Sequence, residues 1–197
     1  MDDFWDSRYA SESYVYGIQP NDYLKKSLKG VNPGTILLPA EGEGRNAVFA
    51  AKLGFVVTAF DTSIEGMKKA LRLAADHNVE IDYQVASYES IILKENHFDV
   101  IALIFAHMNP DKRRQYHREL LVYLKPGGLL ILQGFSKEQI NYQSGGPRDV
   151  NMLFSEEELK GDFSELTSIQ ITSEHTFLSE GDFHLGTAAV INVLGYK

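Results

Sequence analysis

Short apolar segments alternate with amphipathic ones through most of this chain, and this alternation constrains its fold more than any other feature. Thr35 to Pro39 and Phe55 to Phe60 are apolar enough to form buried strands. Each is followed by a segment with helical spacing, Arg45 to Leu53 and Ser63 to His77. Strands and helices that alternate in this way form a parallel sheet covered by helices. The sequence therefore predicts a β-α-β-α beginning.

The alternation continues through the middle of the chain. A weaker strand is predicted at Ile81 to Val85, and Phe98 to Ala106 is apolar on both faces, as a central strand of a parallel sheet is. Pro110 begins a helix that ends at Lys125-Pro126-Gly127-Gly128, and Gly128 to Phe135 forms a fifth strand.

The last third of the chain has a different pattern. A loop is predicted over residues 136–155, after which Ser155 and Glu158 form a capping box that begins a short helix. Leu166 to Leu178 and Leu185 to Leu194 are joined by too few residues for a helical crossover, so they form an antiparallel hairpin. With 197 residues, the chain is expected to form one domain over its whole length.

The composition excludes several classes of function. A formal net charge of -8 argues against a general nucleic-acid-binding protein, so a small-molecule substrate fits better. The chain has no cysteine, and its six histidines have no metal-binding spacing, so no metal is expected. We find no secretory signal and no apolar stretch long enough to span a membrane, which favours a cytoplasmic location and no membrane partner.

A glycine turn, Gly42-Glu43-Gly44, lies between the first predicted strand and helix. Glycine allows a ligand to approach the backbone closely, and the start of the helix offers free N–H groups. Asp61 ends the next strand, where its carboxylate can accept the two ribose hydroxyls of an adenosine-type cofactor. Gly42-x-Gly44-x-x-Ala47 also matches the dinucleotide pattern, so NAD stays a competitor. A purely structural turn is the third alternative.

Four segments, in order along the chain, resemble the motifs of the class I methyltransferases, in particular those of the branch that contains tellurite-resistance and thiopurine methyltransferases. The segments are Glu41 to Ala47, Ala59 to Ser63, Phe98 to Ile101, and Leu124 to Gly128. The terminal hairpin is also similar to the usual end of that family's sheet.

The resemblance implies a three-layer, Rossmann-like α/β fold with helices on both faces of a seven-stranded, mostly parallel sheet. The implied strand order is 3-2-1-4-5-7-6, with an antiparallel last strand. It also implies S-adenosylmethionine as cofactor, S-adenosylhomocysteine as product, and methyl transfer to a small-molecule nucleophile.

The first motif departs from the family at two positions. It usually begins with an acidic residue and a first glycine, where this chain has Leu38 and Ala40. The missing acid normally helps to hold the amino-acid end of the cofactor. Glu41 and Glu43 are the nearby acids, and Glu41 is the better candidate to hydrogen-bond the ammonium group, directly or through water. The alternative is that both face solvent.

The other cofactor-binding positions follow from the resemblance. Ala86-Ser87-Tyr88 should edge the adenine, and Phe105 should approach the reactive sulfur because ligands bind at the carboxyl ends of parallel strands. Met67 could lie on the adenine face, although it fits an apolar helix stripe better. The full expected set is Tyr9, Tyr14, Ala40, Glu41, Gly42, Gly44, Asn46, Asp61, Thr62, Met67, Ala86, Ser87, Tyr88 and Phe105.

Three polar residues are candidates for the catalytic site. His107 follows the fourth strand directly and could accept a proton near neutral pH, or it could be a structural loop histidine. His184 follows the hairpin turn, and Arg148 lies in the long loop; each could equally be a solvated loop residue. His175 instead alternates in phase with Ile169, so we expect it to face the core.

The first 30 residues are expected to form a helical cap over the cofactor. Trp5 to Tyr9 resembles the leader of the same branch, and Tyr9, Tyr14 and Tyr16 could wall the cofactor pocket and exclude water. The alternative is ordinary packing of an N-terminal helix on the sheet.

Two other functions remain open. An NAD-dependent oxidoreductase would need a hydride-transfer acid such as a Tyr-x-x-x-Lys pair, which the chain lacks. A non-catalytic module could keep the fold and bind the cofactor. The resemblance leaves tellurite, thiols and other small nucleophiles open as acceptors, and no feature predicts an oligomeric state.

Overall fold

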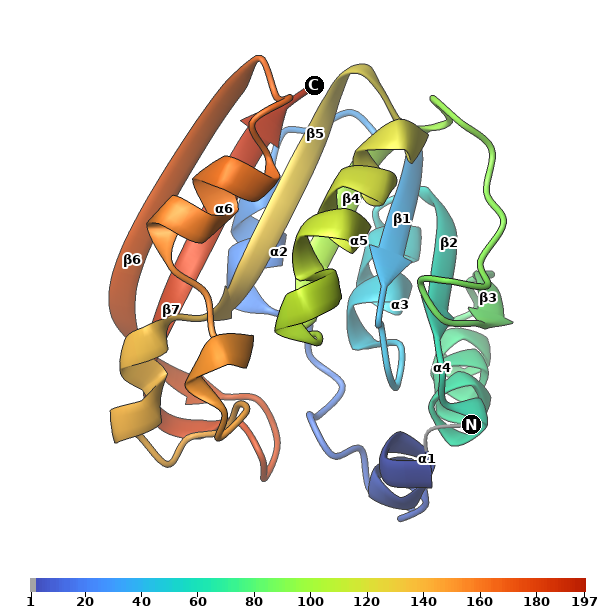
Figure 1. The fold of residues 1–197 in the computed structure, drawn as a ribbon. Helices are drawn as coiled ribbons and strands as arrows, with labels where there is room; N and C mark the ends of the chain where they lie inside the picture. The colour runs from blue at the N-terminus through green and yellow to red at the C-terminus, as the bar shows by residue number, and fades with distance from the viewer. Residues whose placement is uncertain (1–2) are drawn as a thin grey trace.

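The computed structural model describes residues 3–197 and contains a single seven-stranded sheet with helices around it (Figure 1). The strands are β1 (Thr35–Pro39), β2 (Val56–Asp61), β3 (Asp82–Val85), β4 (Phe98–Ile104), β5 (Leu124–Phe135), β6 (Ser168–Ser179) and β7 (Leu185–Tyr196). The helices are α1 (Asp3–Tyr9), α2 (Asp22–Ser27), α3 (Arg45–Lys52), α4 (Ile64–Asp76), α5 (Pro110–Tyr123) and α6 (Glu156–Asp162), with short 3₁₀ helices η1 (Lys137–Asn141) and η2 (Val150–Met152).

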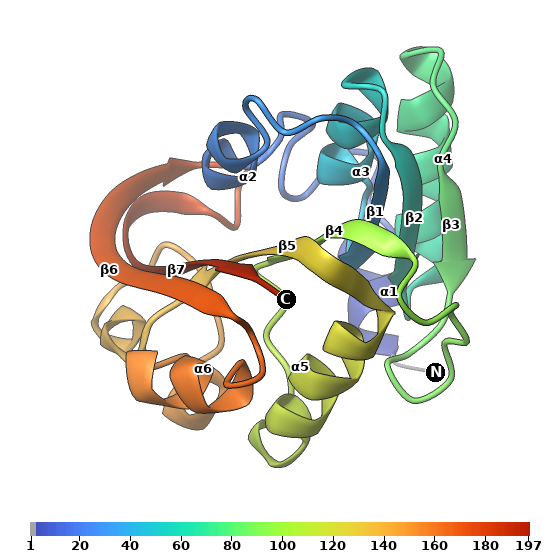
Figure 2. The same cartoon turned by 90° about the horizontal axis from the view of Figure 1, so that it is seen from above.

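The strand order confirms the prediction from sequence. It is β3-β2-β1-β4-β5-β7-β6, with β1 to β5 parallel and β7 antiparallel to both of its neighbours. Parallel neighbours joined by right-handed crossovers place their connecting helices on the sheet's two faces. Helices α2, α3 and α4 lie on one face, and α5 and α6 lie on the other (Figure 2).

The core fills both faces of the sheet. Alternate residues of β4 separate into two clusters: Ile101 and Leu103 pack under α5 and α6, whereas Val100 and Ala102 pack under the helices of the opposite face. This burial on both sides is why β4 lacks the polar alternation of a half-exposed strand.

Local capping signals set the helix boundaries. Asn21, Ser63 and Asn109 each accept a backbone N–H of the helix that follows, as N-cap residues do. Ser155 and Glu158 form the expected capping box at the start of α6.

Strand β5 begins four residues earlier than predicted, at Leu124 instead of Gly128. Leu124 pairs with Phe98, and the register then shifts before Leu129 pairs with Val100. Helix α5 ends at Tyr123, and the Lys-Pro-Gly-Gly segment that follows forms an irregularity inside the ladder, where the N–H of Gly127 donates to the carbonyl of Lys197.

The prediction for His175 is wrong. Its side chain is exposed and lies 3.2 Å from the Glu138 carboxylate. Most of β6 is exposed because it forms the edge of the sheet. The ring of His175 contacts the ring of Tyr142, which directly follows η1. The strand periodicity indicated the face of the sheet on which His175 lies, but not whether another element covers that face.

The N-terminal segment divides into two parts. Helix α1 lies beyond the carboxyl ends of the parallel strands and contacts α4 (Figure 1). Helix α2 instead packs against β5 on a face of the sheet. The expected cap over residues 1–30 is therefore limited to α1 and the segment that follows it, and residues 1 and 2 of that expectation lie outside the described residues.

Candidate functional site

A cavity lies where the carboxyl ends of β1, β2, β3 and β4 meet, and we call it the strand-end cavity. Chain segments after each of these strands contribute to its wall, which is the usual ligand position in an open parallel sheet. It is lined by Trp5, Tyr9, Tyr16, Ala40, Glu41, Arg45, Asn46, Phe60, Asp61, Thr62, Ala86, Ser87, Tyr88, Ile104, Phe105, Ala106, His107 and His184.

Asp61 lies in this wall with both carboxylate oxygens already oriented. Oδ2 accepts the N–H of Gly42 at 3.1 Å, and Oδ1 accepts the N–H of Ser63 at 2.9 Å. Burial raises the pKa of Asp61, against the opposing effect of these hydrogen bonds. Each oxygen keeps a further lone pair, so the carboxylate can also accept two hydroxyl groups from a ligand.

Glu41 occupies the N-terminus of α3. Its Oε1 accepts the N–H groups of Asn46 and Ala47, each at 2.8 Å, and its side chain is buried in the cavity wall. Burial raises the pKa of Glu41 to about 7, because it outweighs the hydrogen bonds and the nearby Arg45. The alternative that Glu41 faces solvent is therefore wrong, and the helix N–H groups that Glu41 binds are not free for a phosphate.

Glu43 has a different role and is also buried. It forms an ion pair with Lys69 of α4 at 2.7 Å and accepts the backbone N–H of Val15 at 2.8 Å. It therefore ties the N-terminal segment to the body of the domain. Its position between two glycines did not indicate these partners, which lie more than 25 residues away.

The two glycines of the turn do not line the cavity. A Cβ on Gly42 would lie 2.7 Å from the Tyr9 hydroxyl, and a Cβ on Gly44 would lie 2.5 Å from Cβ of Ala70. Both residues have positive φ, 62° and 87°. They allow the turn to pack against the N-terminal segment and α4, which is a correction to their expected direct contact with the cofactor.

Two further expected cofactor contacts lie elsewhere. Tyr14 donates its hydroxyl to the carbonyl of Lys69 on α4, and Met67 packs against the core. Neither lines the cavity. Met67 therefore takes the core position that its helical spacing favoured.

The adenine-side positions line the cavity. Ser87 lies 3.2 Å from the hydroxyl of Ser90, and the Tyr88 ring stacks on Tyr116 with centroids 5.0 Å apart. The Tyr88 hydroxyl is buried and has no hydrogen-bond partner among residues 3–197. A buried polar atom of this kind requires a partner that a ligand or water can supply.

His107 lies in the cavity wall with both ring nitrogens occupied. Nδ1 lies 2.8 Å from the carbonyl of Met152, and Nε2 accepts the N–H of Phe135 at 2.9 Å. Burial lowers the pKa of His107 to about 4. The imidazole is neutral and both of its nitrogens are hydrogen-bonded. Its only lone pair is therefore already used, which argues against the general-base role expected for it.

His184 differs from His107 because only one of its ring nitrogens is bonded. Nδ1 lies 3.3 Å from Oε2 of Glu180, which also forms an ion pair with Arg45 at 2.8 Å. Nε2 has no hydrogen-bond partner in the described part of the chain. Glu180 was missed from the sequence because it lies in a hairpin turn, where an acidic residue is ordinary.

A second cavity, of about 730 Å³, adjoins the first, and we call it the aromatic cavity. It shares Trp5, Tyr16, Phe105, His107 and His184 with the strand-end cavity. Its own lining consists of Phe4, Arg8, Met108, Asn109, Phe135, Gln143, Gly145, Gly146, Pro147, Arg148, Asp149, Met152, Asp182 and Phe183.

Arg148, expected as a catalytic candidate, lies at the exposed rim of the aromatic cavity. Its guanidinium donates to the carbonyl of Tyr142 at 2.7 Å and to Gln143 at 2.6 Å. These contacts hold the 136–155 loop together. Arg148 does not reach the strand-end cavity.

The N-terminal segment contributes to the walls of both cavities. Asp6 accepts the hydroxyl of Ser63 at 2.6 Å, at the start of α4. On the other side, the Arg8 guanidinium lies 4.2 Å from the ring centroid of Phe183 in the hairpin connection. Helix α1 is thus attached to the domain at two points, one beside each cavity.

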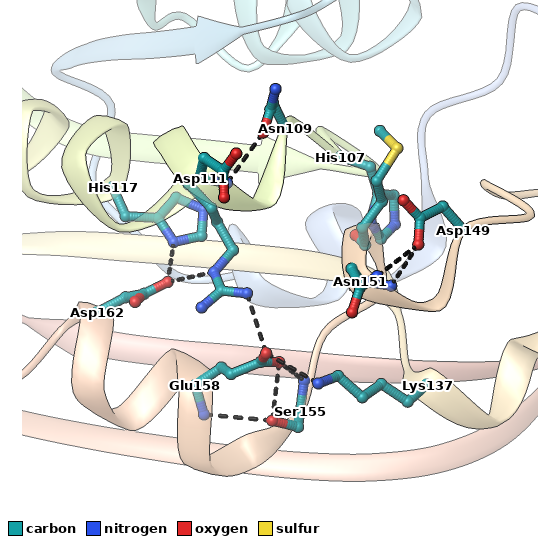
Figure 3. A network of polar contacts seen from close by, with 12 residues as sticks. His107, Asn109, Asp111, His117, Lys137, Asp149, Asn151, Ser155, Glu158 and Asp162 are labelled. Carbon is teal, nitrogen blue, oxygen red and sulfur yellow. Dashed lines mark hydrogen bonds and ion pairs between the residues drawn. The ribbon is translucent and has the colours of Figure 1, made fainter.

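A separate polar network joins α5 to α6 (Figure 3). Asp162 accepts from Arg113 at 2.7 Å and lies 2.9 Å from Nδ1 of His117. His117 lines neither cavity. This buried histidine and carboxylate therefore hold two helices together beside the site.

Neither membrane nor metal features are found in the described chain. Within residues 3–197, no helix is long and apolar enough to cross a membrane. The same residues contain no cluster of three or more side chains able to hold a metal ion.

Comparison with known proteins finds a family match in the central part of the chain. Residues 36–128 match the family described as a methyltransferase domain. A ubiquinone/menaquinone biosynthesis C-methyltransferase, UbiE, from Ectopseudomonas mendocina is 32% identical over 56% of this chain and 45% of its own length. A ubiquinone biosynthesis O-methyltransferase from Caulobacter is 34% identical over 42% of this chain and 33% of its own. The chain thus matches less than half the length of these relatives.

Solved structures share the fold over the whole chain. A protein studied for the conversion of a disulfide bond into a thioacetal group during echinomycin biosynthesis has a TM-score of 0.77 at 20% identity, covering 100% of this chain and 92% of that one. TehB from Haemophilus influenzae has a TM-score of 0.73 at 17% identity, covering 100% of this chain and 66% of that one. These structures confirm the expected class of fold. The match to a methyltransferase domain supports S-adenosylmethionine as the cofactor.

Proposed function

We propose that this chain, whose residues 36–128 match the methyltransferase domain family, transfers a methyl group from S-adenosylmethionine to a small-molecule nucleophile. The observation that carries this proposal is the pair of adjoining cavities, one at the strand ends and one lined by aromatic rings, which share Phe105 and His184. Relatives named for the biosynthesis of ubiquinone and menaquinone, both small molecules, agree with an acceptor of this kind.

The residues of the strand-end cavity fit a nucleoside that carries an amino-acid group. Asp61 would accept the ribose hydroxyls, and Ser87 would lie at the adenine edge. Glu41 offers a carboxylate to the ammonium group, and Arg45, 7% exposed in the wall, offers a guanidinium to the carboxylate. When bound, S-adenosylmethionine supplies a methyl group that its positively charged sulfur has already activated.

The protein's own contribution is alignment and the exclusion of water. Trp5 and Tyr16 of the N-terminal segment line both cavities, next to Phe105 and His184. Holding two reactants in a suitable geometry can contribute up to about 7 to 11 kcal/mol to a reaction. Reaction with water is also suppressed when the site is closed.

The competing NAD function is disfavoured by Glu41. In dinucleotide-binding sites, the N–H groups at the start of the first helix bind the pyrophosphate. Here those of Asn46 and Ala47 already donate to Glu41, at 2.8 Å each. A pyrophosphate would have to displace this carboxylate or approach it closely, which like charges oppose.

We expect the N-terminal segment to move outward when the cofactor enters. The strand-end cavity measures about 210 Å³, below the roughly 300 to 1,000 Å³ usual for small-molecule sites. Trp5, Tyr9 and Tyr16 form its outer wall, and Trp5 is the chain's single tryptophan. Addition of S-adenosylhomocysteine should therefore change tryptophan fluorescence with the same dissociation constant as calorimetry; an unchanged spectrum at saturation would contradict this movement.

The experiment that tests the proposed function is methyl transfer to a panel of small thiols, amines and hydroxyl compounds, followed by measuring formation of S-adenosylhomocysteine. Turnover above the rate without acceptor supports the proposal. Tight binding of S-adenosylmethionine without turnover of any acceptor would instead support the non-catalytic module.

Replacing Glu41 by glutamine tests whether it substitutes for the acid missing at Leu38. The loss of one charge-assisted hydrogen bond, worth about 1.5 to 3 kcal/mol, should weaken S-adenosylmethionine binding roughly 10- to 100-fold. Because the pKa of Glu41 is raised to about 7, the wild-type carboxylate is lost below that pH, and cofactor affinity should fall as pH decreases from 7.5 to 5.5. Calorimetric titrations should show a weaker pH dependence in the variant; equal affinity and equal pH dependence would remove Glu41 from this role.

The same substitution should also change how stability depends on pH. In the wild type, cofactor affinity is expected to rise with pH, whereas the contribution of Glu41 to stability is expected to fall. A carboxyl group with a raised pKa in the folded state binds its proton more tightly there than in the unfolded chain, so its contribution to stability falls as pH rises from about 4.5 to 7. The glutamine variant lacks this loss. Without cofactor, its melting temperature relative to wild type should therefore be higher at pH 8 than at pH 5.

A further inference from the structure

Aromatic side chains from several elements contribute to the wall of the aromatic cavity. Six aromatic residues contribute to its wall: Phe4, Trp5, Tyr16, Phe105, Phe135 and Phe183. They come from α1, the segment after it, the ends of β4 and β5, and the connection between β6 and β7. Planar apolar ligands bury surface against such walls and make favourable ring contacts. The cavity therefore suits a flat aromatic molecule.

His184 projects into this aromatic environment at the boundary between the two cavities. Its ring centroid lies 4.6 Å from that of Tyr16, 4.5 Å from Phe105 and 5.2 Å from Phe135. The side chain is buried, with 6% relative exposure. It lines both cavities, so a group bonded to it would lie next to the place where the cofactor binds.

Glu180 fixes which nitrogen of His184 carries the proton. Burial opposes ionisation of Glu180, but hydrogen bonds from His184 and Arg45 outweigh it and lower its pKa to about 2. An ionised carboxylate can only accept, so Nδ1 of His184, 3.3 Å away, is the donor. The neutral imidazole then has its lone pair on Nε2, which has no partner among residues 3–197.

Several elements hold Glu180 in place. Arg45 of α3 donates to Oε2 at 2.8 Å, and Asn21, the N-cap of α2, donates to Oε1 at 2.9 Å. The other ionisable groups around His184 are Tyr16 of the N-terminal segment and His107 after β4. Burial lowers the pKa of His184 despite Glu180, so the imidazole is neutral near pH 7. A neutral, oriented imidazole is the form that a general base requires.

We propose that the aromatic cavity binds a phenol, an aromatic ring bearing a hydroxyl group, and that Nε2 of His184 accepts the hydroxyl proton while Glu180 positions the imidazole. This inference rests on the proposed methyl transfer and identifies its acceptor and its base. The phenol oxygen bonds to the methyl carbon, the carbon–sulfur bond breaks with its electron pair on sulfur, and the proton passes to Nε2 and then to water.

The presence of an oriented base favours a hydroxyl group over a thiol. A thiol with a pKa near 8.5 is partly ionised at neutral pH without help, whereas a phenol with a pKa near 10 is not. His107 cannot take this role, because Nε2 is bonded to the N–H of Phe135. His184 is thus the histidine of the cavity wall with a free lone pair.

The proposal is tested with phenol, 4-methylphenol and 2-naphthol, with cyclohexanol as a non-aromatic control and 4-nitrothiophenol as the thiol. We expect all three phenols to bind the S-adenosylhomocysteine complex in calorimetric titrations, and cyclohexanol to bind at least 10-fold more weakly. His184→Asn should lower kcat for the phenols by about 10²- to 10⁴-fold with little change in KM. Its effect on 4-nitrothiophenol should be less than 10-fold.

Glu180→Gln tests the positioning role by a readout that folding alone does not change. Because Glu180 raises the pKa of His184, the variant should lower that pKa in an NMR titration, with the His184 signal assigned by its loss in His184→Asn. It should also lower kcat for the phenols, and Glu180→Asp should restore part of the rate. The matched control pair is His175→Asn and Glu138→Gln, an exposed histidine and its carboxylate 3.2 Å apart, which should leave kcat and KM unchanged.

Distinct results separate this inference from the proposed function. If none of the phenols binds, or if His184→Asn methylates them at the wild-type rate, the inference is wrong even when other acceptors are methylated. If S-adenosylmethionine does not bind the wild-type protein at all, the proposed function fails first. An unchanged His184 pKa in Glu180→Gln would overturn the positioning role by itself.

Discussion

Replacing Asp61 by alanine is expected to weaken S-adenosylmethionine binding about 100-fold or more. Its carboxylate is buried in the strand-end cavity and is held by the N–H groups of Gly42 and Ser63. Hydrogen bonds from two ribose hydroxyls to this charged group would contribute roughly 3 kcal/mol or more in total, which is about 100-fold in affinity. Calorimetric titration of the folded variant measures the loss.

The control for Asp61→Ala separates lost ribose contacts from a disturbed turn. Alanine also leaves the two N–H groups without their acceptor, which lowers stability by about 1 to 3 kcal/mol for each. Adenosine and 2′,3′-dideoxyadenosine should therefore be compared in both proteins. Wild type should bind adenosine more tightly, and the variant should bind the two equally. A variant that still prefers adenosine by the wild-type factor would show that Asp61 does not bind the ribose.

The second large effect is expected at Gly44, on stability and not on cofactor contact. A Cβ there would lie 2.5 Å from Cβ and 2.7 Å from Cα of Ala70, so α3 and α4 would have to separate. Its φ of 87° adds the cost of a left-handed conformation. Together, strain and overpacking should lower the free energy of unfolding of Gly44→Ala by roughly 2 to 5 kcal/mol in urea denaturation.

Gly30→Ala is the matched control for this prediction. Gly30 has nearly the same φ, 84°, but no atom lies within 4 Å of a Cβ at that position. The free energy of unfolding of Gly30→Ala should therefore fall only by the cost of the left-handed conformation, about 1 to 2 kcal/mol. Ala70→Gly combined with Gly44→Ala should recover part of the difference. Equal losses in Gly30→Ala and Gly44→Ala would mean that the glycine is required for its backbone angle alone.

Features that depend on neighbouring residues were predictable from the sequence. Burial of β4 on both faces follows from its apolar run, and the β6–β7 hairpin follows from the short connection between them. Asp61 was found because it ends a strand next to a glycine turn. The capping box at Ser155 is likewise a contact over three residues.

Features that depend on distant partners were not predictable. Glu180 pairs with Arg45 across 135 residues, and no local pattern distinguishes it from other acidic turn residues. His107 and His184 look alike in sequence, yet backbone groups of Phe135 and Met152 occupy both nitrogens of His107. Whether a histidine keeps a free lone pair is decided by tertiary contacts.

Glu41 was found from the sequence, but its contacts are known only from the structure. The sequence showed that Leu38 replaces the usual acid and suggested Glu41 as a residue that could bind the ammonium group instead. Its contacts with the N–H groups of Asn46 and Ala47 add a consequence that spacing alone does not give. The same carboxylate that suits an ammonium group also occupies the place where a dinucleotide would put its phosphates.

Calorimetric titration of the wild-type protein with S-adenosylhomocysteine and with NAD tests this choice of cofactor most directly. We expect saturable binding of S-adenosylhomocysteine at pH 7.5 and no measurable binding of NAD under the same conditions. Binding of NAD at equal or higher affinity would contradict the assignment of the strand-end cavity to S-adenosylmethionine.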